Sequence, residues 1–447
     1  MIRSPDDPIA ALATPLASSA LAVIRVSGTG SLDLLARLVK GGGTAASWRG
    51  NSIRRRVMRD GEEDVDEVML AVYRAPRSYT GEDSAEIISH GSIPVIQRLL
   101  SLLTRSGFRP AGPGEFTQRA FLNGRMDLTR AEAVNEIVRA RTDRARALAL
   151  QRLSGAIESR VRAAREGLVD LRAGLEVAID YPEDQHEGGL DHQGALDRTI
   201  SLLEGLTRTY RQGRIYQEGA SVAIAGATNS GKSSLFNAIL RQERAIVSDV
   251  HGTTRDWLEG TVSLEGIPVR LFDTAGLRRT SDPLEVEGMR RTGQVLESAD
   301  CVIYIVDSTR GLDDEDRAFL SRRSGVPLVR AWNKVDLPES RSAPEGFMPL
   351  SATTGHGLEK LETEVAATLG SPAESGEPLI DSVRQRDLIG RALAALGRLR
   401  EARARGVSAD LLAVDLADAM DALGEITGEI TTAEVLERMF AAFCVGK

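Results

Sequence analysis

Four short motifs, in a fixed order within one stretch of the chain, constrain the fold more than any other feature. They are GATNSGKS from Gly226 to Ser233, GTTRD from Gly252, DTAG from Asp273 and NKVD from Asn333, with SAT at Ser351 as a weaker fifth. The first motif follows the apolar segment SVAIAG and precedes the helical segment SSLFNAIL. A strand, a glycine-rich loop and a helix in this order form a phosphate-binding loop, and such loops belong to α/β domains with a mainly parallel sheet.

The residues of the first three motifs suit a nucleoside triphosphate and a magnesium ion. Backbone amides between Asn229 and Ser234, with the N-terminus of the following helix, would hold the phosphates. Lys232 would neutralise phosphate charge, and Ser233 would ligate the magnesium. Asp273, at a strand end, would lie near the metal, and Thr254 would close on it from a mobile loop.

The fourth motif indicates which base is bound. Asp336 can accept two hydrogen bonds from the edge of guanine, an arrangement that adenine cannot offer. Asn333 and the aliphatic stem of Lys334 would brace the base. Because all the motifs occur in order, the sequence predicts a GTPase.

Two residues constrain the hydrolytic mechanism. Leu277 follows DTAG, where many regulatory GTPases carry a glutamine that orients the attacking water, so another group must do so here. Asp282, Glu285 and Glu287 are the nearest acidic candidates, although each also fits an exposed carboxylate at a helix start. The amide of Asn229 could help to hold a monovalent cation beside the phosphates, or it could bond its own loop backbone.

Length and composition limit the class of protein. The 447 residues are enough for two to four domains, and 42% hydrophobic and 27% charged residues are ordinary for a soluble protein. No apolar run approaches the ~20 residues that a bilayer requires, and the N-terminal segment is acidic where a signal peptide would be basic. We therefore expect a cytoplasmic protein. The net charge of −8 argues against coating nucleic acid by bulk charge.

The chain divides into segments of different periodicity. Residues 1–115 alternate strand-like and polar stretches and predict an α+β domain, whereas 116–217 are rich in alanine, leucine and arginine at helical spacing. Residues 218–372 alternate strands and helices around the nucleotide motifs, and 373–447 are helical again. The simplest organisation is a nucleotide domain inserted into an all-helical domain that is built from two chain segments.

The sequence resembles the MnmE (TrmE) family of tRNA-modification GTPases from end to end. The resemblance lies in VIRVSG, YTGEDSAEIISHG, PGEFTQRAFLNGRMDLTRAEAV, the nucleotide motifs and the C-terminal FCVGK. FCVGK after an amphipathic helix is nearly diagnostic, because other GTPases with the same phosphate loop lack it.

The resemblance implies a function that the residue patterns alone do not. Such proteins form homodimers and work on tRNA with an MnmG (GidA)-like partner that depends on flavin and NADH, in a heterotetramer or larger complex. Together they add a carboxymethylaminomethyl or aminomethyl group to C5 of the wobble uridine of certain tRNAs. The one-carbon unit comes from 5,10-methylene- or 5-formyl-tetrahydrofolate, which the N-terminal α+β domain binds. GTP hydrolysis requires magnesium, is assisted by potassium and accompanies pairing of the GTPase domains.

The resemblance also implies residue roles in the nucleotide domain. Asn229, Ser248, Val250 and Thr253 match the potassium ligands, Ser233 and Thr254 match the magnesium ligands, and Glu285 matches the glutamate that orients the attacking water. The full set of expected GTP-binding residues is Asn229, Ser230, Gly231, Lys232, Ser233, Ser234, Ser248, Asp249, Val250, His251, Gly252, Thr253, Thr254, Asp273, Thr274, Ala275, Gly276, Asn333, Lys334, Asp336, Ser351 and Ala352.

Further roles implied by the resemblance lie outside that domain. Arg25, Glu86, Arg125 and Lys447 match the folate contacts, since cations suit the glutamate tail of a folate and a carboxylate suits its pterin. Cys444 matches a cysteine that the modification requires, as a nucleophile or a redox partner. Cys301, in the apolar segment CVIYIVD, is expected to be an inert core thiol.

Two questions stay open at this level. The arginines of the helical run from Arg139 to Arg165 could bind tRNA phosphates, or they could form a solvated face paired with Glu and Asp. The chain could also be a ribosome-assembly or other RNA-binding GTPase without modification chemistry, or a GTP-dependent dimer that regulates a partner enzyme. The ribosome-assembly alternative does not account for FCVGK, whereas the regulatory dimer stays open.

Overall fold

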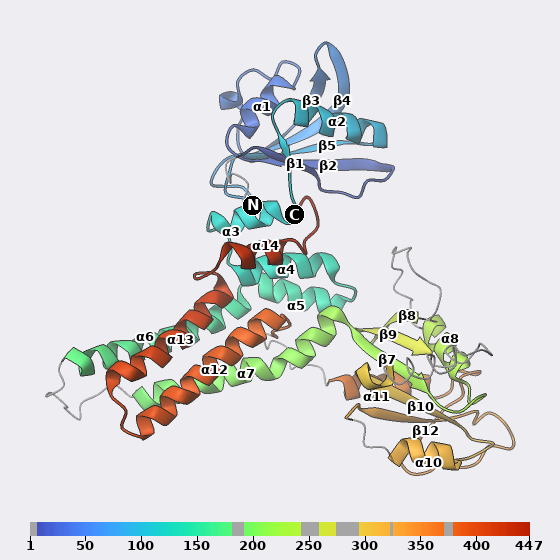
Figure 1. The fold of residues 1–447 in the computed structure, drawn as a ribbon. Coiled ribbons are helices and arrows are strands. Elements are labelled where there is room, and N and C mark those ends of the chain that lie inside the picture. The colour runs from blue at the N-terminus through green and yellow to red at the C-terminus, as the bar shows by residue number, and fades with distance from the viewer. Residues whose placement is uncertain (1–6, 181–191, 243–258, 274–294, 322–324, 371–378) are drawn as a thin grey trace, which may run out of the picture. The chain divides into compact units, whose positions relative to one another are not determined.

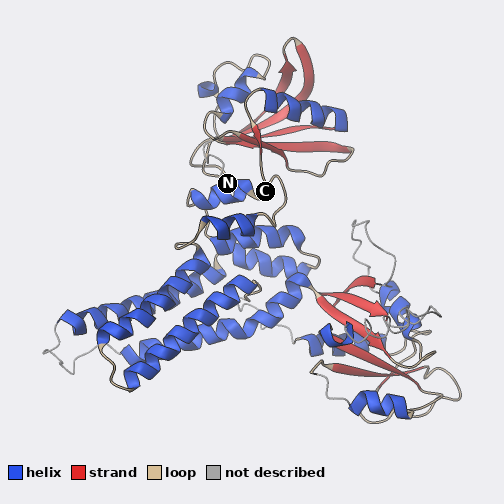
Figure 2. Cartoon of the chain, viewed as in Figure 1, coloured by secondary structure: helices blue, strands red, loops and turns tan. Residues whose placement is uncertain are grey.

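The computed structural model describes residues 7–180, 192–242, 259–273, 295–321, 325–370 and 379–447 (Figures 1 and 2). Contacts between Cα atoms divide the chain into two compact units. One consists of Met1–Asn135 with Asp421–Lys447, and the other of Glu136–Met420. The domain boundaries expected at 115, 217 and 372 remain predictions, because this division groups the nucleotide domain with part of the helices.

The first unit contains a six-stranded sheet in the order β3-β4-β5-β2-β1-β6. Its strands are β1 (Ile9–Leu12), β2 (Ser19–Ser27), β3 (Ser52–Asp60), β4 (Glu63–Tyr73), β5 (Ser84–Gly91) and β6 (Arg109–Pro110). All neighbouring strands pair antiparallel except β1 and β6. The helices of this sheet region are α1 (Ser31–Arg37) and α2 (Ile93–Arg105). The sheet and helices confirm the predicted α+β class.

Helix α2 shows how this region acquires its core. Pro94 lies in its first turn, where a missing backbone N–H is tolerated. Leu99, Leu102 and Leu103 follow at helical spacing and are buried with Ile24 and other apolar side chains of the sheet. Alternate residues of β2 supply Ile24 and Val26 to the same core, as expected for a strand with one buried face.

The C-terminal segment packs on the N-terminal part of the chain. One apolar cluster contains the buried side chains of Leu128, Phe440 and Phe443. The helices that form it or pack against it are α3 (Glu115–Leu122), α4 (Leu128–Arg139) and α14 (Ala433–Phe440). The backbone N–H of Phe116 donates to the carbonyl of Lys447 at 3.2 Å, and Pro113 bridges to Val445. Residues more than 300 positions apart in the sequence therefore lie side by side.

The second unit contains long helices with apolar residues at a period near 3.6. They are α5 (Asp143–Leu153), α6 (Ala156–Asp180), α7 (His192–Glu218) and α12 (Val383–Ala404), and α13 (Ala409–Thr427) extends across the division of the chain. Thr142 is the N-cap residue of α5, and its hydroxyl accepts a hydrogen bond of 3.2 Å from the N–H of Ala145. The predicted helices on both sides of the nucleotide motifs are confirmed.

The nucleotide motifs lie on a second six-stranded sheet, in the order β12-β11-β10-β7-β9-β8. Its strands are β7 (Ala220–Ala225), β8 (Glu259–Leu264), β9 (Ile267–Asp273), β10 (Cys301–Asp307), β11 (Leu328–Asn333) and β12 (Met348–Pro349). The helices described in this region include α8 (Lys232–Gln242), α10 (Asp314–Ser321) and α11 (Leu358–Leu369). The strands pair parallel except β8 with β9, which confirms the predicted mainly parallel sheet.

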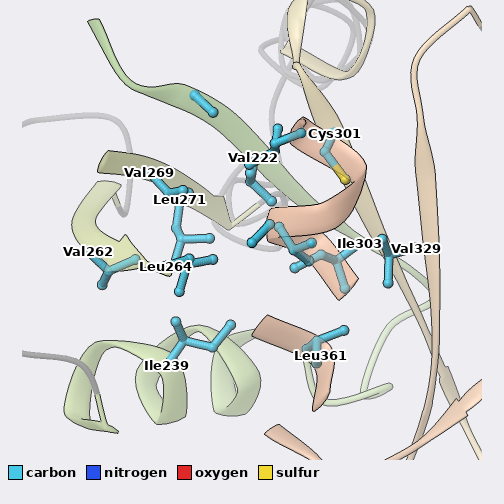
Figure 3. Close-up of a cluster of buried hydrophobic side chains, with 14 of the residues drawn as sticks. Val222, Ile239, Val262, Leu264, Val269, Leu271, Cys301, Ile303, Val329 and Leu361 are labelled. Atoms are coloured by element: carbon cyan, nitrogen blue, oxygen red, sulfur yellow. The ribbon is translucent and has the colours of Figure 1, made fainter. Parts of the chain in front are cut away.

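Apolar side chains from this sheet and its helices form one core. Val222, Leu271 and Ile303 come from three neighbouring strands, and Ile239 and Leu361 come from α8 and α11 (Figure 3). Val222, Leu271 and Ile303 are completely buried, as in strands that are covered on both faces. This packing holds the ends of the parallel strands in fixed positions.

The cysteine of β10 belongs to this core. The Cys301 side chain is fully buried, and its burial raises the pKa of the thiol to about 12. A protonated thiol is a poor nucleophile, and the predicted position of Cys301 in the core is confirmed. None of the helices in the described part of the chain is long and apolar enough to cross a membrane.

An ionised glutamate at the start of α3 supports the first unit. Burial acts to raise the pKa of Glu115, but hydrogen bonds outweigh it and lower the pKa to about 2. Its carboxylate accepts from Arg109 at 3.0 Å, from the N–H of Gly112 at 2.8 Å and from Arg119 at 3.0 Å. Arg119 is itself buried and also pairs with Glu82.

We predict that this carboxylate makes the unit acid-sensitive. The folded pKa lies below the ordinary value of 4.5, so its stabilisation is complete above pH 4.5 and is lost as the pH falls towards 2. The loss is on the order of 3 kcal/mol. We therefore expect the free energy of unfolding, measured with urea, to be higher for the wild type than for Glu115→Gln at pH 7, and this difference should become smaller as the pH is lowered to 3.

The matched control is Glu62→Gln, because the Glu62 side chain is fully exposed. The free energy of unfolding of this variant should equal that of the wild type at every pH. A constant difference between the wild type and Glu115→Gln across the whole range would contradict the assignment.

Candidate functional site

The carboxyl ends of the parallel strands collect polar residues at one edge of the second sheet. Asp273 is the last residue of β9, Asp307 of β10 and Asn333 of β11, and the glycine-rich loop follows β7. Ligands of open parallel sheets bind at this edge. The topology thus brings together three motifs that lie far apart in the sequence; Ser230 and Asn333, for example, are 103 positions apart.

The lysine of the glycine-rich loop forms hydrogen bonds with the backbone of the same loop. Lys232 is the first residue of α8, and its Nζ donates to the carbonyls of Gly226 at 3.0 Å and Ala227 at 2.7 Å. Gly226 and Gly231 have backbone φ angles of 147° and 103°, which residues other than glycine rarely adopt. The loop therefore presents its backbone and an ammonium group at a helix N-terminus, an arrangement that binds phosphate.

A hydroxyl and a carboxylate stand beside this loop. Ser233 Oγ donates to Asp273 Oδ2 at 2.7 Å, and the Asp273 side chain is buried. Such hard oxygen atoms suit magnesium, which proteins hold through one or two oxygens together with the phosphates of the substrate. These two residues fit the predicted metal role. Thr254, the other expected magnesium ligand, lies outside the described residues.

Asn333 joins three loops of the site through its side-chain amide. Its Nδ2 donates to the carbonyl of Ser230 at 2.9 Å, and its Oδ1 accepts from the N–H of Ala352 at 3.0 Å. The side chain is 2% exposed, and a Cβ on Gly231 would lie 2.1 Å from its Nδ2. The NKVD motif, the phosphate loop and the SAT segment are thus held as one structure.

The remaining residues of the base site have different environments. Asp336 is exposed in the turn after β11, where its carboxylate can meet the edge of a base. Ser351 is fully buried, and its Oγ accepts from the N–H of Thr354 at 3.2 Å. Lys334 pairs with Asp307, a residue that the sequence motifs did not single out.

Several expected residues cannot be placed. The potassium residues Ser248, Val250 and Thr253, the segment Thr274 to Gly276, and Glu285 with its alternatives lie outside the described residues. Asn229 is described: it is exposed and has a φ angle of 62°. This conformation is compatible with a turn and with an amide turned to a cation, so the potassium site stays a prediction.

A second cluster, in the first unit, contains three of the four expected folate residues. Arg25 Nη2 lies 2.8 Å from Glu86 Oε1, and Arg25 Nη1 donates to the carbonyl of Gly446 at 3.1 Å. The neighbouring Lys447 is partly buried, and burial and the charge of Arg25 lower its pKa. The C-terminal residues therefore bring a second cation to the Arg25–Glu86 pair.

Two aromatic rings that the sequence did not single out border this cluster. Arg25 Cζ lies 5.5 Å from the ring centroid of Tyr79 and 5.6 Å from that of Phe116. Tyr79 is held by a hydrogen bond of 2.9 Å between its hydroxyl and Thr117. The YTGED segment that contains Tyr79 was visible in the sequence, but only the fold places its ring beside the guanidinium.

The fourth expected folate residue, Arg125, and the predicted modification cysteine, Cys444, are both exposed. Arg125 packs against Gly81, where a Cβ would lie 3.3 Å from its Cγ. The thiol of Cys444 is exposed, and the carbonyl of Cys444 accepts from the N–H of Gly114 at 3.2 Å. Backbone hydrogen bonds thus hold the FCVGK segment, while its cysteine side chain faces solvent.

Arginines of the helical run from Arg139 to Arg165 form ion pairs with acidic residues. Arg152 is 2% exposed and pairs with Glu136 and Asp381. Arg146 pairs with Asp143, and Arg162 with Glu158. These contacts favour the alternative in which the arginines pair with acidic residues, and they give Arg152 a role in the core.

Comparisons with known proteins cover the whole chain. The family models that match are described as "MnmE helical domain", over residues 128–444, and "GTP-binding protein TrmE N-terminus", over residues 8–125. The chain is 39% identical to the "tRNA modification GTPase MnmE" of Syntrophus aciditrophicus over 454 aligned residues, which cover 99% of each protein. Proteins with the same description from Aquifex aeolicus, 39% identical, and Moorella thermoacetica, 41% identical, match over 99% of this chain and 100% of their own lengths.

Solved structures align with part of the chain. Aquifex aeolicus Era bound to GDP and aluminium fluoride is 24% identical over 39% of this chain and 66% of that one, with a TM-score of 0.27. The G domain of the Thermotoga maritima FeoB iron transporter is 27% identical over 33% of this chain and 98% of that one, with a TM-score of 0.25.

We predict that Gly231→Ala abolishes most nucleotide binding. The added methyl group would occupy the position of Asn333 Nδ2, and alanine disfavours the φ angle of 103°. Affinity for GDP should fall by roughly 100-fold or more, measured by titration with a fluorescent GDP analogue.

Gly325→Ala is the matched control, because a Cβ at Gly325 meets nothing within 4 Å. It should bind GDP like the wild type. Thermal unfolding of both variants without nucleotide checks that they fold. Binding by Gly231→Ala within threefold of the wild type would overturn the geometry described for the loop.

Proposed function

The chain belongs to the MnmE family of tRNA modification GTPases, and we propose that it uses GTP hydrolysis to support modification of C5 of the wobble uridine in certain tRNAs. The product would carry an aminomethyl or carboxymethylaminomethyl group. The observation that carries the proposal is the end-to-end likeness to curated tRNA modification GTPases, since it includes the nucleotide domain, the N-terminal domain and the C-terminal FCVGK segment.

The GTPase half of the proposal rests on the edge of the parallel sheet. Lys232 and the loop amides would bind the phosphates, and Asp336 would select guanine. Magnesium would be held by Ser233 and Thr254, with Asp273 hydrogen-bonded to Ser233 at 2.7 Å. When bound, the metal supplies positive charge to the transferred phosphoryl group, and the chain holds the oxygen ligands in place.

Potassium is the proposed source of a further positive charge. Asn229, Ser248, Val250 and Thr253 would ligate it, and Glu285 would orient the attacking water because Leu277 cannot. The exposed position of Asn229 in the phosphate loop supports this assignment. Pairing of two GTPase domains in a homodimer would accompany hydrolysis.

The one-carbon half of the proposal rests on the cluster around Arg25. Glu86 offers a carboxylate to a pterin edge, and Arg25, Arg125 and Lys447 offer cations to the acidic tail of a 5,10-methylene- or 5-formyl-tetrahydrofolate. The Arg25–Glu86 distance of 2.8 Å and the rings of Tyr79 and Phe116 near Arg25 support a site for a flat, charged ligand.

Cys444 and a second protein complete the proposed chemistry. The exposed thiol lies in the same segment as Lys447 and can act as a nucleophile or a redox partner in the modification. An MnmG-like protein with flavin and NADH would supply the electrons, in a complex of both proteins with tRNA. We place this activity in the cytoplasm.

Mass spectrometry of tRNA nucleosides tests the modification. Cells that lack the protein should lose the substituted wobble uridine, and the unaltered gene should restore it. Cys444→Ser should fail to restore it, whereas Cys301→Ser, which changes a buried core thiol, should restore it in any cell where the protein accumulates. Unchanged nucleosides in the deletion strain would refute the proposal, and full rescue by Cys444→Ser would remove the cysteine from it.

Steady-state hydrolysis in different salts tests the potassium site. At equal ionic strength, potassium should accelerate GTP hydrolysis at least about tenfold over sodium, because one fixed charge near the transferred phosphoryl group has an effect of this size. Asn229→Ala should remove the difference between the two salts. Equal rates of the unaltered chain in sodium and potassium would exclude the site.

A further inference from the structure

The acidic residue at the end of β10 holds the lysine of the NKVD motif. Lys334 Nζ donates to Asp307 Oδ2 at 2.6 Å, with side chains that are 30% and 15% exposed. Asp307 lies next to Asn333 in the pairing of β10 with β11. The contact therefore joins two neighbouring strand ends at the edge of the sheet where the nucleotide motifs collect.

The backbone of Lys334 is also held by the loop after β10. Its φ angle of 70° is in the left-handed region, which residues other than glycine rarely adopt. Ser308, which is fully buried, donates from its Oγ to the carbonyl of Lys334 at 3.1 Å and from its N–H to the carbonyl of Asn333 at 2.9 Å. Strained backbone of this kind persists where the surroundings fix it, and it is concentrated at binding sites.

Asp307 is itself fixed by its second carboxylate oxygen. Oδ1 accepts from the N–H of Thr309 at 2.9 Å and from its hydroxyl at 2.8 Å. Burial acts to raise the pKa of Asp307, but the hydrogen bonds from Lys334 and Thr309 lower it. The carboxylate thus stays ionised at neutral pH and can anchor an ammonium group.

We propose that Asp307 is a positioning residue for guanine nucleotides: by binding Nζ, it keeps the stem of Lys334 extended between the ends of β11 and β10. The four methylene groups then form a fixed apolar surface against which a purine ring can pack beside Asp336. A lysine with a free head would have to lose its side-chain rotamers each time a nucleotide binds. The proposal rests on the assignment of Lys334 and Asp336 to the base and is independent of the tRNA chemistry.

A simpler role for Asp307 must be separated from this one. The carboxylate could serve only to shape the turn at Thr309, and its loss would then act through the loop. The two roles use different oxygens, since Oδ1 contacts Thr309 and Oδ2 contacts Lys334. Asp307→Asn keeps an oxygen for Thr309 and removes the charge that holds Lys334, whereas Thr309→Val removes one hydrogen bond to Oδ1 and leaves Oδ2 unchanged.

The experiment uses the full chain and four variants: Asp307→Asn, Thr309→Val, Lys334→Met and the double variant Asp307→Asn with Lys334→Met. The release rate of a fluorescent GDP analogue, and the KM and kcat of GTP hydrolysis, are measured for each. Asp307→Asn should release GDP about tenfold faster and raise KM by a similar factor, because it loses a charge-assisted hydrogen bond. Its kcat should change less than about twofold, since the contact lies on the base side of the nucleotide.

The double variant identifies the residue through which Asp307 acts. If Asp307 works by holding Lys334, adding Asp307→Asn to Lys334→Met should change GDP release by less than about twofold. Thr309→Val should also stay within about twofold of the unaltered chain. The unaltered chain itself must bind GDP tightly, and its failure to do so would refute the GTPase assignment rather than the role of Asp307.

Three results would overturn the proposal. The first is release of GDP by Asp307→Asn at the rate of the unaltered chain. The second is an equal acceleration by Thr309→Val, which would assign the residue to the turn. The third is a double variant whose effect is the product of the two single effects, which would show that Asp307 does not act through Lys334.

Discussion

The nucleotide site depends on the side-chain amide of Asn333. This one group makes hydrogen bonds of 2.9 Å and 3.0 Å to the phosphate loop and to the SAT segment, which belong to different parts of the chain. Because the amide is buried, either bond left unmade would expose an unpaired polar group to an apolar environment, which is costly. The glycine at position 231 is required for the same reason, since any side chain there would displace the amide. The side chain of Asn333 therefore fixes the NKVD motif, the phosphate loop and the SAT segment relative to one another.

Lysine and arginine have separate uses in this chain. Only five of its 56 basic residues are lysines, and three of them lie in the sites described above. Lys232 binds two carbonyl oxygens of a tight loop, and Lys334 binds one carboxylate oxygen, both through a compact ammonium group. Arg152, by contrast, is a core residue whose Nη1 contacts the carboxylates of Glu136 and Asp381. A compact ammonium group and a planar guanidinium differ in shape and in the directions of their donors, so the two residues are not interchangeable at such positions.

The fold could be predicted well where the pattern is local. Local patterns predicted several strands of both sheets and the long helices, because the burial of apolar side chains repeats at a regular spacing along such elements. The patterns could not reveal Arg152 as a core residue. In the sequence it is one of eight arginines in a helical run, and only the fold brings Asp381, 229 positions away, to join Glu136 as a partner of its buried guanidinium. Asp307 was missed for a similar reason, since a carboxylate at a strand end is common and its partner follows 27 residues later.

The sequence by itself determined the GTPase class, the order of the nucleotide motifs and the family, because these depend on residue types at short, fixed spacings. It also named Arg25, Glu86 and Lys447, although it could not bring them together. The tertiary structure decided that the C-terminal segment reaches Arg25, whose Nη1 donates to the carbonyl of Gly446. Backbone hydrogen bonds from Gly114 and Phe116 to residues more than 300 positions later hold that segment in place. The tertiary structure likewise decided that Asp307 holds Lys334. Long-range contacts follow from the pairing of strands and the packing of cores, and neither can be read from the spacing of residues along the chain.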